Sequence, residues 1–151
     1  MSFRQLKELT ENDKGLIIEE LKAILHRREE IVFALLFGSL VNPPISGKYG
    51  DMDIGLYVRP DSVRAAEYVL EARIEVEIYH ALTRRGVTFP PPEVLILNNA
   101  PNHFLVRIFK GNYVILKGEE GAITDFIEEI SEKSMANFHF RMESLRDIVE
   151  G

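Results

Sequence analysis

A continuous run of apolar residues, Ile31-Val32-Phe33-Ala34-Leu35-Leu36-Phe37, constrains the fold of this 151-residue chain more than any other feature. The run ends at Gly38, and an apolar run bounded by a turn residue is typical of a strand that is buried on both faces. Such a strand requires other elements to cover both sides of its sheet.

The rest of the chain alternates between helical spacing of apolar residues, which predicts helices, and short apolar runs, which predict strands. The predicted helices are residues 10–28, 62–84, 101–109, 124–130 and 135–149. The predicted strands are residues 31–37, 52–58, 93–97 and 113–116. Proline and glycine breakers predict a loop at residues 41–50. Strands separated by helices, with a helical C-terminal tail, predict an α/β (α+β) fold with a mixed sheet.

Length and composition set the number of domains. A typical domain has about 100–200 residues, so this chain is long enough for one. Its apolar fraction of 46% and its charged fraction of 28% are ordinary for a globular protein. We therefore expect residues 1–151 to form a single domain, with its core at about residues 31–116 and helices at about residues 119–149.

Several classes of protein are excluded or disfavoured. The chain has no cysteine, which excludes a disulfide scaffold, a thiol nucleophile and a cysteine-based zinc site. The histidines also lack the spacing of zinc ligands. The net charge of −6 argues against nucleic acid as the main partner, because binding to a phosphate backbone usually requires a basic face. No secretory signal and no membrane-spanning run is present, so we expect a cytoplasmic protein without a membrane partner.

Gly38 and Ser39 follow the first predicted strand directly and form the first of three features that can carry chemistry. A glycine at this place lets the backbone approach a ligand closely, because no Cβ stands in the way. Backbone N–H groups at a following helix start, together with the Ser39 hydroxyl, would form a site for an anion.

Asp51, Asp53 and Glu93 form the other two features. Asp51 and Asp53 are two residues apart, so in a strand their carboxylates point to the same side. Two acids on one side repel each other unless a cation lies between them, and Mg²⁺ is the natural occupant. Glu93 begins a later strand and brings a third carboxylate if the two strands are neighbours. Two divalent ions about 3.5–4 Å apart would then assist an in-line displacement at phosphorus.

Each feature alone also has an ordinary explanation. Gly38-Ser39 is compatible with a simple turn, Asp51 and Asp53 with a solvated loop or a helix cap, and Glu93 with an exposed strand entry. The order of the three along the chain, at the ends of successive strands, favours the chemical interpretation.

Four segments carry a resemblance to a known family: Phe37-Gly38-Ser39, Asp51-Met52-Asp53-Ile54-Gly55-Leu56, the stretch from Glu93 to Pro101, and Gly111-Asn112-Tyr113-Val114-Ile115-Leu116. On these residues the chain resembles the minimal nucleotidyltransferases of the polymerase-beta-like superfamily. The resemblance runs from about residue 31 to residue 116 and implies a nucleotidyltransferase fold.

The resemblance implies a role for each matching residue. Gly38 and Ser39 would bind the triphosphate of a nucleotide, and Asp51, Asp53 and Glu93 would hold two Mg²⁺ ions. Glu93 would also help to activate an acceptor hydroxyl. Members of this size resemble antitoxins encoded beside a HEPN-domain ribonuclease toxin. Such proteins are similar to enzymes that transfer AMP from ATP to a tyrosine of the toxin.

Two departures from the family pattern leave alternatives open. Many members carry Ala-Arg-Gly shortly after Gly-Ser, whereas this chain reads Leu40-Val41-Asn42-Pro43-Pro44, which leaves Lys48 as the candidate cation for the triphosphate. Glu93 stands where aspartate is usual. The runner-up is therefore a catalytically weak or inactive antitoxin that masks its partner by contact. Transfer to tRNA or to a small molecule is disfavoured, because the acidic charge opposes RNA binding and we expect no room for a separate substrate domain. An open sheet edge would also allow a homodimer.

Overall fold

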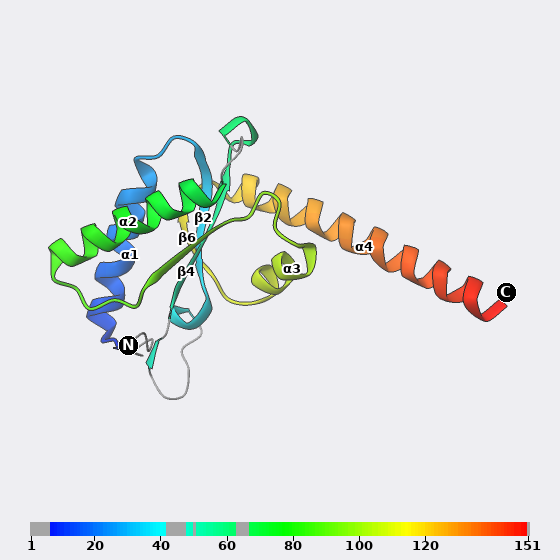
Figure 1. The fold of residues 1–151 in the computed structure, drawn as a ribbon, viewed down its shortest axis with the longest axis horizontal. Helices are drawn as coiled ribbons and strands as arrows, with labels where there is room; N and C mark the ends of the chain where they lie inside the picture. Colours follow the sequence, from blue (N-terminus) through cyan, green and yellow to red (C-terminus); the bar gives the residue numbers. More distant parts are fainter. Residues whose placement is uncertain (1–6, 42–47, 50, 63–66, 151) are drawn as a thin grey trace.

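The computed structural model describes residues 7–41, 48–49, 51–62 and 67–150. Of residues 7–8, 48–49, 62, 137–141 and 143–150 only the backbone is described. Within these ranges the chain forms a mixed sheet with helices on both of its faces (Figure 1). The α/β prediction is therefore confirmed.

The main sheet has four strands in the order β5-β4-β2-β6. The strands are β2 (Ile31–Phe37), β4 (Met52–Val58), β5 (Pro92–Ile96) and β6 (Val114–Lys117). β2 pairs in antiparallel fashion with β4 and β6, whereas β5 runs parallel to β4. The start of β4 and the start of β5 therefore lie at the same end of the sheet as the last residue of β2.

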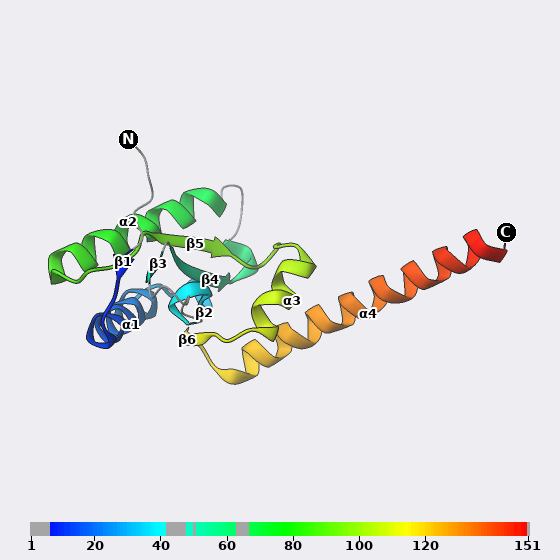
Figure 2. The same ribbon diagram turned by 90° about the horizontal axis from the view of Figure 1, so that it is seen from below.

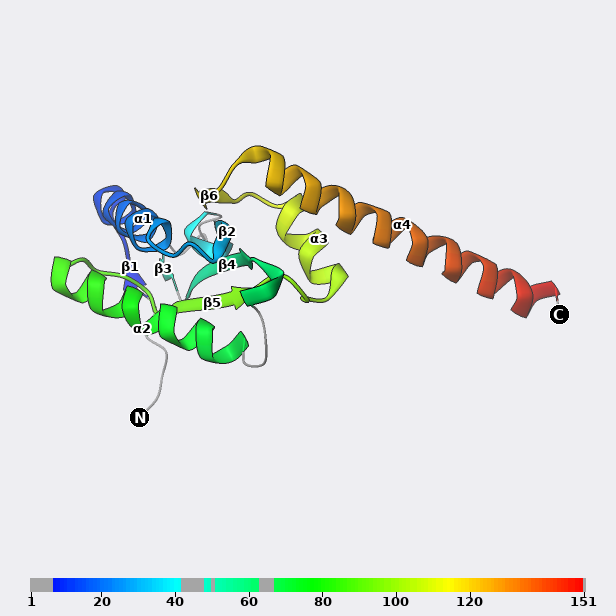
Figure 3. The same cartoon turned by 90° about the horizontal axis from the view of Figure 1, so that it is seen from above.

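Two pairs of helices cover the sheet. One pair is α1 (Glu11–His26) with α2 (Glu67–Arg85), and the other is α3 (Asn102–Lys110) with α4 (Glu120–Glu150). Figures 2 and 3 show the two pairs on opposite sides of the strands, and α4 continuing well beyond the rest of the fold. Two short 3-10 helices, η1 (Gly38–Leu40) and η2 (Pro60–Ser62), follow β2 and β4.

The alternation of side chains along β2 divides the core into two clusters. Ala34 and Leu36 belong to the cluster beneath α1 and α2, whereas Phe33 and Leu35 belong to the cluster beneath α3 and α4. Because successive strand residues point to opposite faces, one apolar run supplies both clusters. This is the physical reason that the run carries no polar residue.

The β5 edge of the sheet is closed by carboxylates of α2. Glu75 Oε1 accepts a hydrogen bond of 2.9 Å from the Val94 N–H, and Glu71 Oε2 accepts one of 2.8 Å from the Ile96 N–H. Edge N–H groups are the usual template for pairing with another chain, so these carboxylates block that edge. A homodimer stays a prediction, and it cannot form by strand addition at the N–H groups of Val94 and Ile96 while these bonds are in place.

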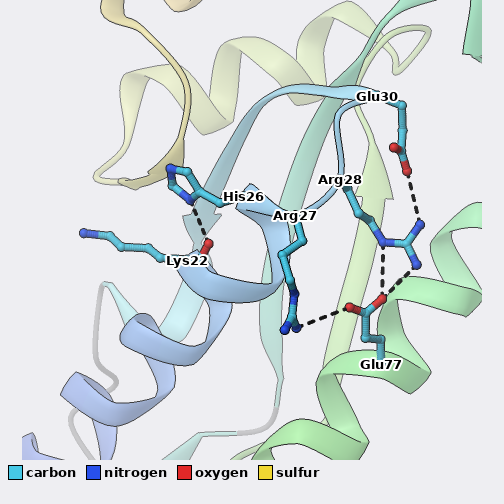
Figure 4. A network of polar contacts seen from close by, with 6 residues as sticks. All are labelled: Lys22, His26, Arg27, Arg28, Glu30 and Glu77. Atoms are coloured by element: carbon cyan, nitrogen blue, oxygen red, sulfur yellow. Dashed lines mark hydrogen bonds and ion pairs between the residues drawn. The ribbon is translucent and has the colours of Figure 1, made fainter.

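An arginine–glutamate network lies at the end of the sheet remote from Gly38, where Ile31 is the register partner of Val58 (Figure 4). Arg28 donates to Glu77 at 2.8 Å and to Glu30 at 3.1 Å. Burial by itself lowers the pKa of Arg28, but the hydrogen bonds and charges of the two glutamates outweigh it and raise that pKa above its ordinary value. The network fastens the turn after α1 to α2.

Three predicted boundaries were wrong. Residues 124–130 and 135–149 belong to one helix, α4, because the residues between them include no proline or glycine and the helix propagates through them. Within the predicted loop 41–50, Lys48–Tyr49 forms a strand, β3, that pairs with β1 (Lys7–Glu8), a pairing too short to leave a periodic pattern. The predicted helix start at residue 62 instead belongs to η2, residues 63–66 lie outside the described residues, and α2 is described as Glu67–Arg85.

Candidate metal and nucleotide site

The sheet brings the three predicted carboxylates together at one end. Asp53 is the register partner of Phe37 in β2 on one side and of Glu93 in β5 on the other. Its neighbours Met52 and Ile54 point into the core beneath α1 and α2, so Asp53 points to the face covered by α3 and α4. Asp51 precedes β4 by one residue and completes the group.

The spacing of the carboxylates fits a hard divalent cation. One oxygen from each of Asp51, Asp53 and Glu93 lies within 4.8 Å of the others. Mg²⁺ binds oxygen at about 2.0–2.1 Å, so two ligands on opposite sides of one ion are about 4 Å apart. Small rotations of the side chains would therefore bring the three oxygens onto one ion. A pair of ions about 3.5–4 Å apart also matches this spacing.

Gly38 makes a tight bend directly against this group. Its φ of +81° lies in the left-handed region that favours glycine. A Cβ at this position would collide with the carboxylate oxygen Oδ2 of Asp53. Both the backbone conformation and the space therefore require glycine, and the backbone reaches the carboxylates without a side chain between them.

Ser39 connects the bend to the acidic segment. Its hydroxyl donates a hydrogen bond of 3.1 Å to the backbone carbonyl of Asp51. Gly38, Ser39 and Leu40 form the single turn of η1, whose first N–H groups have no acceptor within the turn itself. The predicted helix start after Gly38 is thus present as a 3-10 turn. It presents backbone donors at the end of the sheet where the carboxylates meet.

Not every predicted site residue is described. Lys48 lies in β3, but its side chain falls outside the described residues, so its suggested contact with a triphosphate stays a prediction. No sequence pattern predicts a role for α3 (Asn102–Lys110). The Phe104 ring of this helix lies 6.3 Å from that of Phe37, measured between centroids. No local pattern marks a residue that approaches a site from a separate element.

The fold and the acidic group define a nucleotidyltransferase domain. The family model described as "Polymerase beta, Nucleotidyltransferase" matches residues 19–120. The matched segment contains β2, η1, β4 and β5 and therefore every residue of the site described above. The chain belongs to this family.

Solved structures share the fold at low sequence identity. An MNT antitoxin in complex with a tri-AMPylated HEPN toxin of Shewanella oneidensis matches with a TM-score of 0.62 and 14% identity, over 90% of this chain and 98% of that chain. A toxin–antitoxin structure with AMP-PNP also has a TM-score of 0.62, at 13% identity, over 87% of this chain and 98% of that one. The toxin–antitoxin MntA-HepT matches with a TM-score of 0.56 and 14% identity, covering 93% and 99%. These similarities establish a common fold.

No curated protein matches this chain. Among the described residues, no helix combines the length and the apolar character that crossing a membrane requires.

Proposed function

We propose that this protein transfers AMP from ATP to a hydroxyl group of a HEPN-domain partner protein and acts as the antitoxin of that partner. The proposal rests on the family to which the chain belongs and on solved relatives with the same fold. One of these relatives is described with an AMPylated HEPN toxin and another with AMP-PNP. With ATP as the donor, the reaction would take place in the cytoplasm.

The observation that carries the proposal is the convergence of Asp51, Asp53 and Glu93 beside the bend at Gly38. Three like charges within 4.8 Å repel one another and cost stability unless a cation neutralises them. Such an arrangement is understandable as a binding site for Mg²⁺ and phosphate.

Each residue has a role in the proposed reaction. Asp51, Asp53 and Glu93 would hold Mg²⁺, which would neutralise negative charge on the phosphates. Gly38, Ser39 and Lys48 would bind the triphosphate. The acceptor oxygen forms a bond to the α-phosphorus of ATP as the bond from that phosphorus to the bridging oxygen of the β-phosphate breaks, and pyrophosphate leaves. Glu93, which is exposed, would help to remove the proton of the acceptor hydroxyl.

Radioactive transfer tests the proposal. The protein and Mg²⁺ are incubated with a HEPN-domain protein from the same genome and with ATP labelled at either the α- or the γ-phosphorus. We expect the α-label alone to appear on the partner, because pyrophosphate carries the γ-label away. The double variant Asp51→Asn with Asp53→Asn should lose more than about 100-fold of the transfer rate, since loss of even an outer-shell partner of a metal ligand costs about 10–100-fold. Full labelling by this variant would refute the metal assignment.

A second candidate function is an antitoxin that masks its partner by contact without turnover. The observation that favours it is the segment Leu40-Val41-Asn42-Pro43-Pro44, which offers no arginine to the triphosphate. The same double variant separates the two functions in cells. If masking is the function, the variant still neutralises the partner, whereas an enzyme that acts by transfer loses this protection.

A further inference from the structure

We propose that α3 forms one wall of the nucleotide site, in which Phe104 stacks on the base and Arg107 pairs with the phosphates. This inference rests on the proposed function, since it concerns how the same site would hold ATP. It assigns to α3 the positive charge that the segment after Gly38-Ser39 does not supply.

The aromatic part of the wall stands beside the carboxylates. Phe37 is the register partner of Asp53 and directly precedes Gly38. The rings of Phe37 and Phe104 meet edge to face, with centroids 6.3 Å apart and planes at 74°. Both side chains are only half-buried. The partly exposed rings of Phe37 and Phe104, next to the bend at Gly38, offer an apolar surface on which a base can stack.

The last turn of α3 lies near the end of β2 that leads into Gly38. The helix follows β5, and it is capped by Gly111 shortly before Val114, the first residue of β6. Val114 is the register partner of Leu36, one residue before Phe37. The last turn of α3 therefore lies on the β2–β6 side of the sheet, which is also the side of Gly38.

The faces of α3 place Arg107 toward the site. Leu105 and Ile108 are buried in the core. Lys110 lines a small surface hollow together with Ile127 and Ile130 of α4, so Lys110 lies on the α4 side of the helix. Arg107 is three residues after Phe104, and helical residues three apart are surface neighbours with Cβ atoms about 5–6 Å apart. Arg107 consequently shares the side of α3 on which Phe104 meets Phe37.

Arg107 is available to bind an anion. Its side chain is exposed, and among the described side chains it makes no ion pair or hydrogen bond. A guanidinium group binds phosphate oxygens through paired N–H donors, so it is well suited to a triphosphate held next to three carboxylates and their metal.

Calorimetric titration with MgATP compares two variants of the same helix that lose the same charge. Arg107 is three residues after Phe104, whereas Lys110 is six residues after it and lines the hollow next to α4. Arg107→Gln should weaken MgATP binding by about tenfold to 100-fold, because a charge-assisted hydrogen bond is lost. Lys110→Gln, the matched control, should leave the affinity unchanged. Thermal unfolding of both variants checks that α3 remains folded.

Inorganic tripolyphosphate with Mg²⁺ separates the two parts of the wall, because it has phosphates but no base. Arg107→Gln should weaken its binding as well. Phe104→Leu, which keeps an apolar side chain against Phe37, should weaken MgATP binding by about fivefold or more and leave tripolyphosphate binding unchanged.

The outcomes distinguish this inference from the proposed function. If the unaltered protein binds MgATP and the Arg107 and Lys110 variants bind it equally well, the wall is refuted and the proposed function stands. If the unaltered protein binds no MgATP, both are refuted. Equal losses of ATP and tripolyphosphate in Phe104→Leu would refute the stacking role of that ring.

Discussion

The two ends of the main sheet both collect charged side chains, but they do so in opposite ways. At the remote end, Glu77 lies 2.8 Å from Arg28 and 3.7 Å from Arg27, so each negative charge meets a positive one. At the other end, Asp51, Asp53 and Glu93 bring three negative charges within 4.8 Å of one another. One arrangement pairs opposite charges within the chain, whereas the other gathers like charges, as the proposed metal site requires.

The contrast separates a structural cluster from the proposed functional one. The Arg28 network is complete within the chain, and it fastens α2 to the turn that leads into β2. The acidic cluster lies beside the left-handed bend at Gly38, and its three members carry charges of the same sign. Clusters of like charge that a protein must neutralise from outside are typical of sites for metals and phosphates.

Among the single substitutions that compare the two ends of the sheet, the largest effect is expected from Gly38→Ala, which should slow transfer by at least about tenfold. The new Cβ would displace the Asp53 carboxylate from the acidic group, and a misplaced group at a reaction centre costs this much or more. The variant should also lose about 1–2 kcal/mol of unfolding free energy, because alanine disfavours the positive φ. Labelled transfer and chemical denaturation measure the two losses.

Gly15→Ala is the matched control for that substitution. Gly15 lies within α1, and a Cβ there would meet no atom within 4 Å. Alanine should therefore raise the unfolding free energy by about 0.5–1 kcal/mol and leave transfer unchanged. If the Gly38 and Gly15 variants have the same transfer rate and the same unfolding free energy, the bend at Gly38 is not required by the acidic group.

A smaller effect, confined to stability, is expected from Glu77→Gln at the remote end of the sheet. The substitution removes the charge that faces Arg28 and Arg27 and should lower the unfolding free energy by about 1–2 kcal/mol. This loss stays below that of a fully buried pair, because the side chains are partly exposed. Nucleotide binding should not change. Denaturation and MgATP titration of one preparation measure both properties.

Glu129→Gln provides the comparison for that prediction. Glu129 pairs with Lys133 at 3.3 Å, and both side chains are more than half exposed. Its loss should change the unfolding free energy by less than about 0.5 kcal/mol. A Glu77 variant as stable as this one would mean that the remote network does not fasten the fold.

The central strands and the acidic group were predictable from local patterns. The predicted strands at residues 31–37 and 52–58 have the bounds of β2 and β4. The first is an apolar run that ends at Gly38, and the second is a mostly apolar segment that is closed by Arg59-Pro60. The convergence of Asp53 and Glu93 depended on an assumption that two strands are neighbours, and the parallel register of β4 and β5 supports it. The type of the residues and the order of the strands were together enough to predict the group of Asp51, Asp53 and Glu93.

Features that depend on contacts between distant segments were not predictable. The pairing of β1 with β3 involves two residues on each strand, too few for a periodic signal. The continuity of α4 is a local feature and was also not predicted, because the polar residues Ser131 to Ser134 resemble a linker although they include no proline or glycine. The approach of Phe104 to Phe37 results from the path of α3 across the sheet.

One calorimetric measurement tests most directly whether the converging carboxylates hold metal and nucleotide together. It titrates the protein, with and without Mg²⁺, with an ATP analogue that has a methylene bridge between the α- and β-phosphorus. The unaltered protein should bind the analogue in Mg²⁺ and lose at least about tenfold of its affinity in EDTA. Asp53→Asn should show the weak affinity under both conditions. Equal affinity of the unaltered protein with and without Mg²⁺, or of Asp53→Asn and the unaltered protein in Mg²⁺, would contradict the account.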